Sequence, residues 1–184
     1  PMGVARLRSI GDNVYGIDRF LALAAPALTQ AVHPWLAARG GQAAQLPVLV
    51  ALPSEARPGF DARMLQHLLP ALAARVRAPV DLSRSRLVCR DRGGGVAAFE
   101  AALAELRAGR CDVIAVGGVD SYFDPDVLEY LDRELRLHGP DTENGFIPGE
   151  GAGFLLLADS RRAAALPRRA RLRSAVVMDE PRPY

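Results

Sequence analysis

The sequence contains no lysine: all 23 of its basic residues are arginines, and they exceed the 21 acidic residues by two. Without lysine, the chain has no ε-amine for a Schiff base and no lysine that burial could turn into a neutral base. Its only cysteines, Cys89 and Cys111, lie far apart, without the spacing of a zinc site or the surroundings of a disulfide scaffold. We therefore expect neither a metal nor a cofactor.

Long apolar runs are also missing. The longest fall well short of the ~18 residues that suggest a membrane span, and Arg6, Arg8 and Asp12 interrupt any signal peptide at the start. We expect a cytoplasmic protein with neither a membrane nor a nucleic acid as its partner. What the chain does have is 49% apolar residues, mostly alanine and leucine, in a length of 184, which suits one globular domain over 1–184 that is rich in helix formers.

Apolar residues follow helical and strand-like patterns in turn. Helical spacing covers 19–37, 64–76, 96–106 and 127–137, and short apolar runs cover 46–52, 86–89, 112–116, 154–158 and 171–177. Short apolar strands separated by helices predict an α/β fold, a mostly parallel sheet flanked by helices on both faces. Asp18 is the expected N-cap of the first helix, and Asp124 or Asp126 begins the last. The alanine-rich helix 96–106 is expected to be the most buried.

Three segments carry more specific motifs. Residues 95–120 join an alanine-rich helix, a Gly-Arg-Cys-Asp turn and a strand ending on Gly117-Gly118. Residues 144–157 contain Gly-Phe-Ile-Pro-Gly-Glu-Gly-Ala-Gly, and residues 18–24 begin with Asp-Arg. In order and spacing these segments resemble the β-ketoacyl synthases of the thiolase superfamily, and the Gly-Glu-Gly-Ala-Gly run is the most specific of them. The resemblance implies a thiolase-like half of the α/β fold.

The glycine run at 149–153 is expected to form a tight turn between strands, with Gly149, Gly151 and Gly153 allowing positive φ or close backbone approach. It is a poor phosphate loop, because it follows a helix and precedes a strand, the reverse of a dinucleotide-binding turn. Glu150 within it is either a buried acid in a polar network or a turn residue, and its apolar flanks favour burial.

The family resemblance also locates the nucleophile position, which family members fill with a cysteine at the N-terminus of the buried helix, where the helix dipole favours a thiolate. Counted back from Gly117-Gly118 with the family spacing, that position holds Arg92. Arginine cannot be acylated at neutral pH. Alternatively, the chain shifts by one turn and Cys89 is the nucleophile, although Cys89 ends a predicted strand. Cys111, in a helix-to-strand turn, is expected to be a half-buried small hydrophobe.

Other parts of the family pattern lie outside this sequence. The resemblance implies that two active-site histidines and a lysine come from the C-terminal half of the fold, which the chain does not include. We expect solvated or core-edge roles for His33, His67 and His138, which match none of those motifs. No apolar run precedes Asp18, so the family's first strand is also expected to be missing. The residues 179–184 suggest a boundary at which another domain attaches.

The resulting hypothesis is a noncatalytic ketosynthase-like subunit or half-domain, comparable to a chain-length factor, in fatty acid or polyketide-type assembly. A fragment of an active β-ketoacyl-ACP synthase, an acyltransferase completed by a C-terminal half, is the alternative, and a free-standing acyl-binding module is a third. The resemblance implies an acyl carrier protein or acyl-CoA as partner, with contacts from Arg92, Gly93, Gly95, Phe146 and Glu150. It also implies a homodimer, or a heterodimer with a ketosynthase chain, centred on the strand 86–89.

Overall fold

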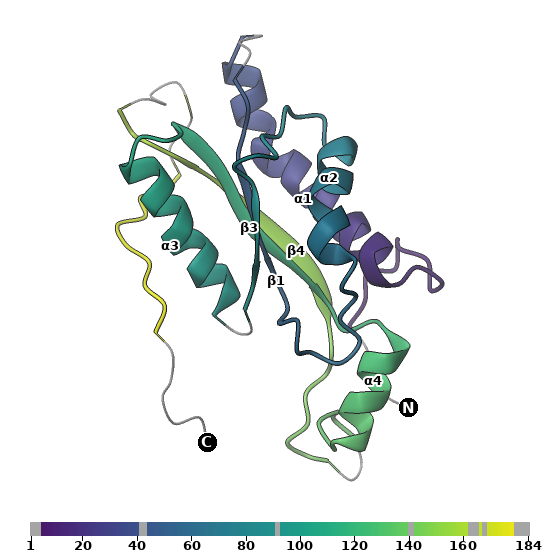
Figure 1. Ribbon diagram of the computed structural model, residues 1–184. Helices are drawn as coiled ribbons and strands as arrows, with labels where there is room; N and C mark the ends of the chain where they lie inside the picture. Colours follow the sequence, from purple (N-terminus) through teal and green to yellow (C-terminus); the bar gives the residue numbers. More distant parts are fainter. Residues whose placement is uncertain are drawn as a thin grey trace.

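The computed structural model describes residues 5–40, 44–90, 93–139, 142–161, 166 and 169–178 (Figure 1). Within these residues helices and strands alternate along the chain, as the apolar patterns predicted. In chain order they are α1 (Gly16–Ala38), β1 (Val48–Leu52), α2 (Met64–Arg75), β2 (Arg86–Cys89), α3 (Gly94–Arg107), β3 (Val113–Ser121), α4 (Pro125–Arg133) and β4 (Glu150–Ala158).

The four strands form one open, mixed sheet in the order β2-β1-β3-β4. β1 pairs in parallel with both β2 and β3, while β4 runs antiparallel to β3 along its whole length, from Val113 opposite Ala158 to Ser121 opposite Glu150. The predicted α/β class with a mostly parallel sheet is thereby confirmed.

Helices cover both faces of this sheet (Figure 1). α1 and α2 pack on one face over Val48, Val50 and Leu52, and α3 packs on the other over Leu49 and Ala51. Every residue of β1 is therefore buried, because its side chains alternate between two covered faces. No described helix has both the length and the hydrophobicity to span a bilayer.

Two helix ends differ from the prediction. Tyr15, not Asp18, is the N-cap of α1, and it makes no side-chain capping bond; Asp18 lies in the first turn instead. α4 begins as predicted at Asp124, whose side chain accepts from the backbone N–H groups of Asp126 and Val127, but it ends at Arg133 rather than at 137. Leu135 then has a φ of 53°, a left-handed conformation that a helix cannot continue through.

The glycine motifs lie inside strands rather than in turns. β3 does not close on Gly117-Gly118 but continues to Ser121, and the predicted turn at 149–153 is wrong because Glu150–Gly153 begins β4. None of Gly149, Gly151 and Gly153 has positive φ. The close approach falls on Gly117, where a Cβ atom would lie 2.2 Å from the Gly153 carbonyl oxygen.

The prediction that α3 is the most buried helix is also wrong. α3 buries Gly94, Ala98, Ala102 and Leu106 against the sheet, but its opposite side is open and Val96 is 45% exposed, whereas α1 buries eight residues. The predicted strand 171–177 is extended but pairs with no strand among the described residues, and it runs beside α3 (Figure 1). A strand needs a hydrogen-bonding neighbour, and the described sheet offers this segment none.

Candidate functional site

The carboxyl ends of β1, β2 and β3 meet at one edge of the sheet, because these strands are parallel. The antiparallel β4 begins at the same edge, where Glu150 pairs with Ser121. α3 also starts there, directly after β2. In open α/β sheets this edge is where ligands bind, and most of the predicted site residues lie along it.

The N-terminus of α3 is the predicted nucleophile region. Arg92 itself lies outside the described residues. Gly93 is the N-cap of α3. No described side chain caps the helix, and no acidic residue occupies its first turn. Gly94 is buried at the sheet, where a Cβ atom would lie 3.6 Å from the carbonyl oxygens of Leu52 and Val88, and Gly95 faces open space.

Cys89 ends β2 and is half-buried beside an open hollow of about 440 Å³. Burial raises the pKa of its thiol above the ordinary value, and the Glu55 carboxylate raises it further. A thiol in these surroundings stays protonated at neutral pH, because no described cation or base hydrogen-bonds to it. The hollow is otherwise lined by Glu55, Leu65, Leu69, Ser85, Arg86 and Leu87.

Cys111 lies in the turn between α3 and β3 and is half-buried, as predicted. Burial raises the pKa of its thiol as well. Neither thiol therefore has the surroundings of an activated nucleophile.

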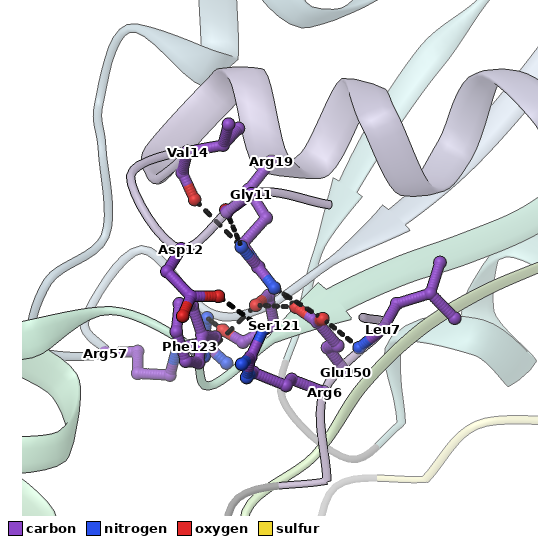
Figure 2. A network of polar contacts seen from close by, with 10 residues as sticks. All are labelled: Arg6, Leu7, Gly11, Asp12, Val14, Arg19, Arg57, Ser121, Phe123 and Glu150. Atoms are coloured by element: carbon purple, nitrogen blue, oxygen red, sulfur yellow. Dashed lines mark hydrogen bonds and ion pairs between the residues drawn. The ribbon is translucent and has the colours of Figure 1, made fainter. Parts of the chain in front are cut away.

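Glu150 is buried in a polar network, the alternative that its apolar flanks favoured. Its Oε2 accepts from Arg19 Nε at 2.5 Å and from Ser121 Oγ at 2.8 Å, and its Oε1 accepts from Arg19 Nη2 and from the Leu7 backbone N–H, both at 2.7 Å (Figure 2). The Arg19 and Glu150 side chains are 0% and 1% exposed. A substrate group could reach Glu150 only by displacing one of these four donors.

The electrostatics of Glu150 follow from the same contacts. Burial alone raises the pKa of its carboxyl, but the hydrogen bonds from Arg19, Leu7 and Ser121 outweigh burial and hold that pKa below its ordinary value. Arg19 completes its own hydrogen bonding at the Gly11 and Val14 carbonyl oxygens.

A second arginine, Arg57, borders this network and was not predicted from the sequence. It donates from Nη1 to Asp120 at 2.6 Å and from Nη2 to the Ser121 carbonyl oxygen at 3.1 Å, and its guanidinium stands 5.0 Å from the centre of the Tyr122 ring. The Arg19 guanidinium stacks over Phe123 at 4.1 Å. No local motif marks Arg57, because its partners belong to β3 and are 63 and 64 positions away.

Phe146 belongs to a small apolar cluster with α4. Its ring meets Tyr122 edge-on at 5.4 Å, and its backbone N–H donates to the Arg136 carbonyl oxygen at 2.9 Å. The three histidines are exposed, as predicted. In the described part of the chain, no three His, Cys, Asp or Glu side chains are grouped as metal ligands.

Comparisons with known proteins place this geometry in context. The model of the β-ketoacyl synthase N-terminal domain matches residues 93–163. The chain is also similar to the ketosynthase from module 6 of the bacillaene synthase from Bacillus subtilis 168, at 25% sequence identity and a TM-score of 0.51. That match covers 81% of this chain but only 27% of the ketosynthase. No curated protein matches the sequence.

The ishigamide ketosynthase/chain length factor shares the fold at a TM-score of 0.57 and 18% identity, over 89% of this chain and 52% of that structure. The chain therefore spans about a quarter of the length of the one relative and about half of the length of the other.

Proposed function

We propose that this chain is a noncatalytic ketosynthase-like half or subunit. It is related to the β-ketoacyl synthases, whose N-terminal half it matches in sequence over residues 93–163 and in fold. It works in fatty acid or polyketide-type chain assembly beside another condensing-enzyme chain, in the manner of a chain-length factor. A cytoplasmic setting is part of the proposal.

The observation that best supports a noncatalytic role is the raised pKa of the Cys89 thiol. The predicted nucleophile position holds Arg92, which cannot be acylated, and Cys89 is the nearest thiol in the sequence. Burial and Glu55 raise its pKa, whereas an acyl-accepting cysteine needs a lowered one. The chain also has no lysine, and its three histidines are exposed.

Open surfaces on the α3 side of the sheet support the proposal that this chain is a half-domain, which a second unit completes. Val96 on α3 is 45% exposed and Leu155 on β4 is 58% exposed. Beside Leu155, Gly151 and Gly153 have no atom within 4 Å of where a Cβ would stand. Mostly parallel sheets bury both faces, so a layer that packs over α3 and β4 completes this one.

The unpaired segment 169–178 fits the same interpretation. Ala175 and Val177 are half-buried, while Leu172, Val176 and Met178 are exposed, so the segment has a strand-like alternation. Its only described hydrogen bond joins Arg107 Nη2 to the Arg173 carbonyl oxygen at 2.9 Å. A completing unit would supply the sheet edge that this segment needs.

The partners belong to the proposal as well. An acyl carrier protein or an acyl-CoA delivers the acyl group, and Arg92, Gly93, Gly95 and Phe146 are the residues proposed to contact it. Glu150, the fifth predicted residue, holds the carboxyl edge together instead, since its oxygens are already occupied by protein donors.

The alternative is a fragment of an active β-ketoacyl-ACP synthase, completed by a C-terminal half. The same open surfaces fit it, and so does the similarity to the bacillaene ketosynthase. The two proposals differ in whether any thiol of this chain carries an acyl group.

Intact-mass spectrometry after incubation with an acyl-CoA and with an acyl carrier protein donor tests this difference. We expect no stable acyl adduct on the wild-type chain. Iodoacetamide labelling at high pH is the positive control that both thiols are reachable, and Cys89→Ser and Cys111→Ser assign any adduct. An acyl adduct that disappears in Cys89→Ser but persists in Cys111→Ser would contradict the noncatalytic proposal and favour the active fragment.

A further inference from the structure

Arg57 fastens the loop after β1 to the end of β3. Nη1 bonds Asp120 and Nη2 bonds the Ser121 carbonyl oxygen, so two of its three nitrogens are fixed by partners on one strand. Its side chain is 16% exposed, and the guanidinium is also held over the Tyr122 ring. Figure 2 shows Arg57 at the margin of the network around Glu150.

The third nitrogen, Nε, is buried and has no hydrogen-bond partner among the described residues. It is the only buried side-chain nitrogen or oxygen in the described part of the chain left in this state. An N–H of a cation that loses its water without gaining a partner is costly, so such a group is normally satisfied by protein or by an ordered water.

A small cavity adjoins Arg57. It leaves about 10 Å³ for the centre of a water molecule, close to the least volume that holds one water and far below that of any organic ligand. Polar and apolar side chains line it, namely those of Arg19, Phe20, Arg57, Met64, Ser121, Phe123, Asp124 and Val127.

Asp124 supplies a second polar partner on this lining. Its Oδ1 caps α4 by accepting from the N–H groups of Asp126 and Val127, at 3.0 and 3.4 Å. Its Oδ2 makes no hydrogen bond within the described residues. The Ser121 hydroxyl donates to Glu150 and accepts from the Phe123 N–H, so it has one acceptor position left.

We propose that this cavity is a site for one ordered internal water, which accepts from Arg57 Nε–H and donates to the Asp124 carboxylate and the Ser121 hydroxyl. These three bonds match the number that a buried water usually makes. Arg57 already connects the loop after β1 to the end of β3, and the water adds the N-terminus of α4 to this connection. It is thus part of the structure that fixes the carboxyl edge of the sheet.

A crystal structure of the full chain at about 1.5 Å resolution tests the site directly. We expect a water within ~3.2 Å of Arg57 Nε that also lies within hydrogen-bond distance of Asp124 or Ser121. Arg19 also lines the cavity, but its Nε already donates to Glu150, so no water should lie within hydrogen-bond distance of that nitrogen. A cavity without density, or an Arg57 Nε bonded to a protein atom, would overturn the proposal.

Solution NMR gives a second readout that does not depend on crystals. The Arg57 Hε resonance should show a cross-peak to a long-lived water. Arg57→Lys, which keeps the charge but removes Nε–H, should lose the cross-peak while its backbone spectrum stays folded. The absence of a cross-peak at Arg57 would contradict an internal water at this site.

Discussion

Arg19 and Glu150, 131 positions apart in the sequence, form a two-point ion pair at 2.5 and 2.7 Å in which both side chains are buried. Through this pair the start of α1 is tied to the start of β4. The remaining donors and acceptors of the two groups connect Leu7, Gly11, Val14 and Ser121 to the same point (Figure 2). The pair therefore holds the N-terminal segment against the carboxyl edge of the sheet.

Glu150→Gln should destabilise the chain by about 3–5 kcal/mol, because it leaves the Arg19 cation buried without its counter-charge. The free energy of unfolding in urea, measured by circular dichroism, provides the test. Glu143→Gln is the matched control, since Glu143 is exposed and the same change there should have almost no effect. Equal, small effects of both substitutions would mean that the pair adds little to stability.

The same pair makes stability depend on pH. The pKa of Glu150 in the folded chain lies below its ordinary value of 4.5, so its contribution is complete above that value. As the pH falls, the unfolded chain takes up the proton first, and the contribution is lost on approach to the folded pKa. Urea unfolding from about pH 7 to about pH 3.5 should show a steeper loss for wild type than for Glu150→Gln. Parallel curves would contradict the assignment, since Asp61, Asp81 and Glu105 also have lowered pKa values and are common to both.

Gly117→Ala should cost about 3 kcal/mol, in the upper range for overpacking. Its Cβ would meet the Gly153 carbonyl oxygen at 2.2 Å and the Phe154 ring at 2.4 Å, and both belong to a paired strand that cannot move freely. Gly151→Ala is the control from the facing strand, where the site is open. It should be neutral or stabilise by ~0.5 kcal/mol, because alanine loses less backbone entropy. The melting temperature should therefore fall in Gly117→Ala and stay unchanged or rise in Gly151→Ala.

How far the sequence could predict this structure depended on the range of the interactions. β2 and the start of α4 were predicted correctly because both depend on neighbouring residues: an apolar run in one case, and in the other a carboxylate that caps the next two N–H groups. Gly117 was noticed only as part of a motif, and its actual constraint, the Phe154 ring, lies across a strand pair.

Longer-range features escaped prediction for the same reason. Glu150 could be suspected of burial from its apolar flanks, but nothing near it in sequence identified Arg19 as its partner. Arg57 was missed altogether, because its partners lie on β3. The predictions of a strand at 171–177 and of α3 as the most buried helix both failed where the described chain offers no covering layer. Local sequence pattern predicts what a segment is suited to form, but pairing and burial need a neighbour.

Asp124→Ala should destabilise the chain by about 1 kcal/mol through loss of the N-cap of α4. Asp132→Ala, an exposed aspartate near the other end of the same helix, is the control and should be neutral. Thermal unfolding of the two variants compares the same change at the two ends of the helix. A loss in Asp132→Ala as large as that in Asp124→Ala would show that the effect is not specific to the cap of α4.

β2 is an open edge of the sheet, and we expect the chain to form a dimer through it, with a copy of itself or with a homologous chain. The family resemblance implies antiparallel pairing of Arg86–Cys89 across a two-fold axis. Such a dimer would also cover the hollow beside β2, where Leu65 is 41% exposed.

Sedimentation of the wild-type chain should therefore show a dimer at about tens of micromolar, as expected of an interface of standard size. Leu65→Asp should weaken the homodimer at least about tenfold, because a leucine that association buries contributes roughly 1.5–3 kcal/mol. Leu155→Asp, at the other edge of the sheet, should leave it unchanged. A monomeric wild type that also fails to pair with a ketosynthase chain would contradict a β2-centred interface, and a dimer lost only in Leu155→Asp would place the contact at β4 instead.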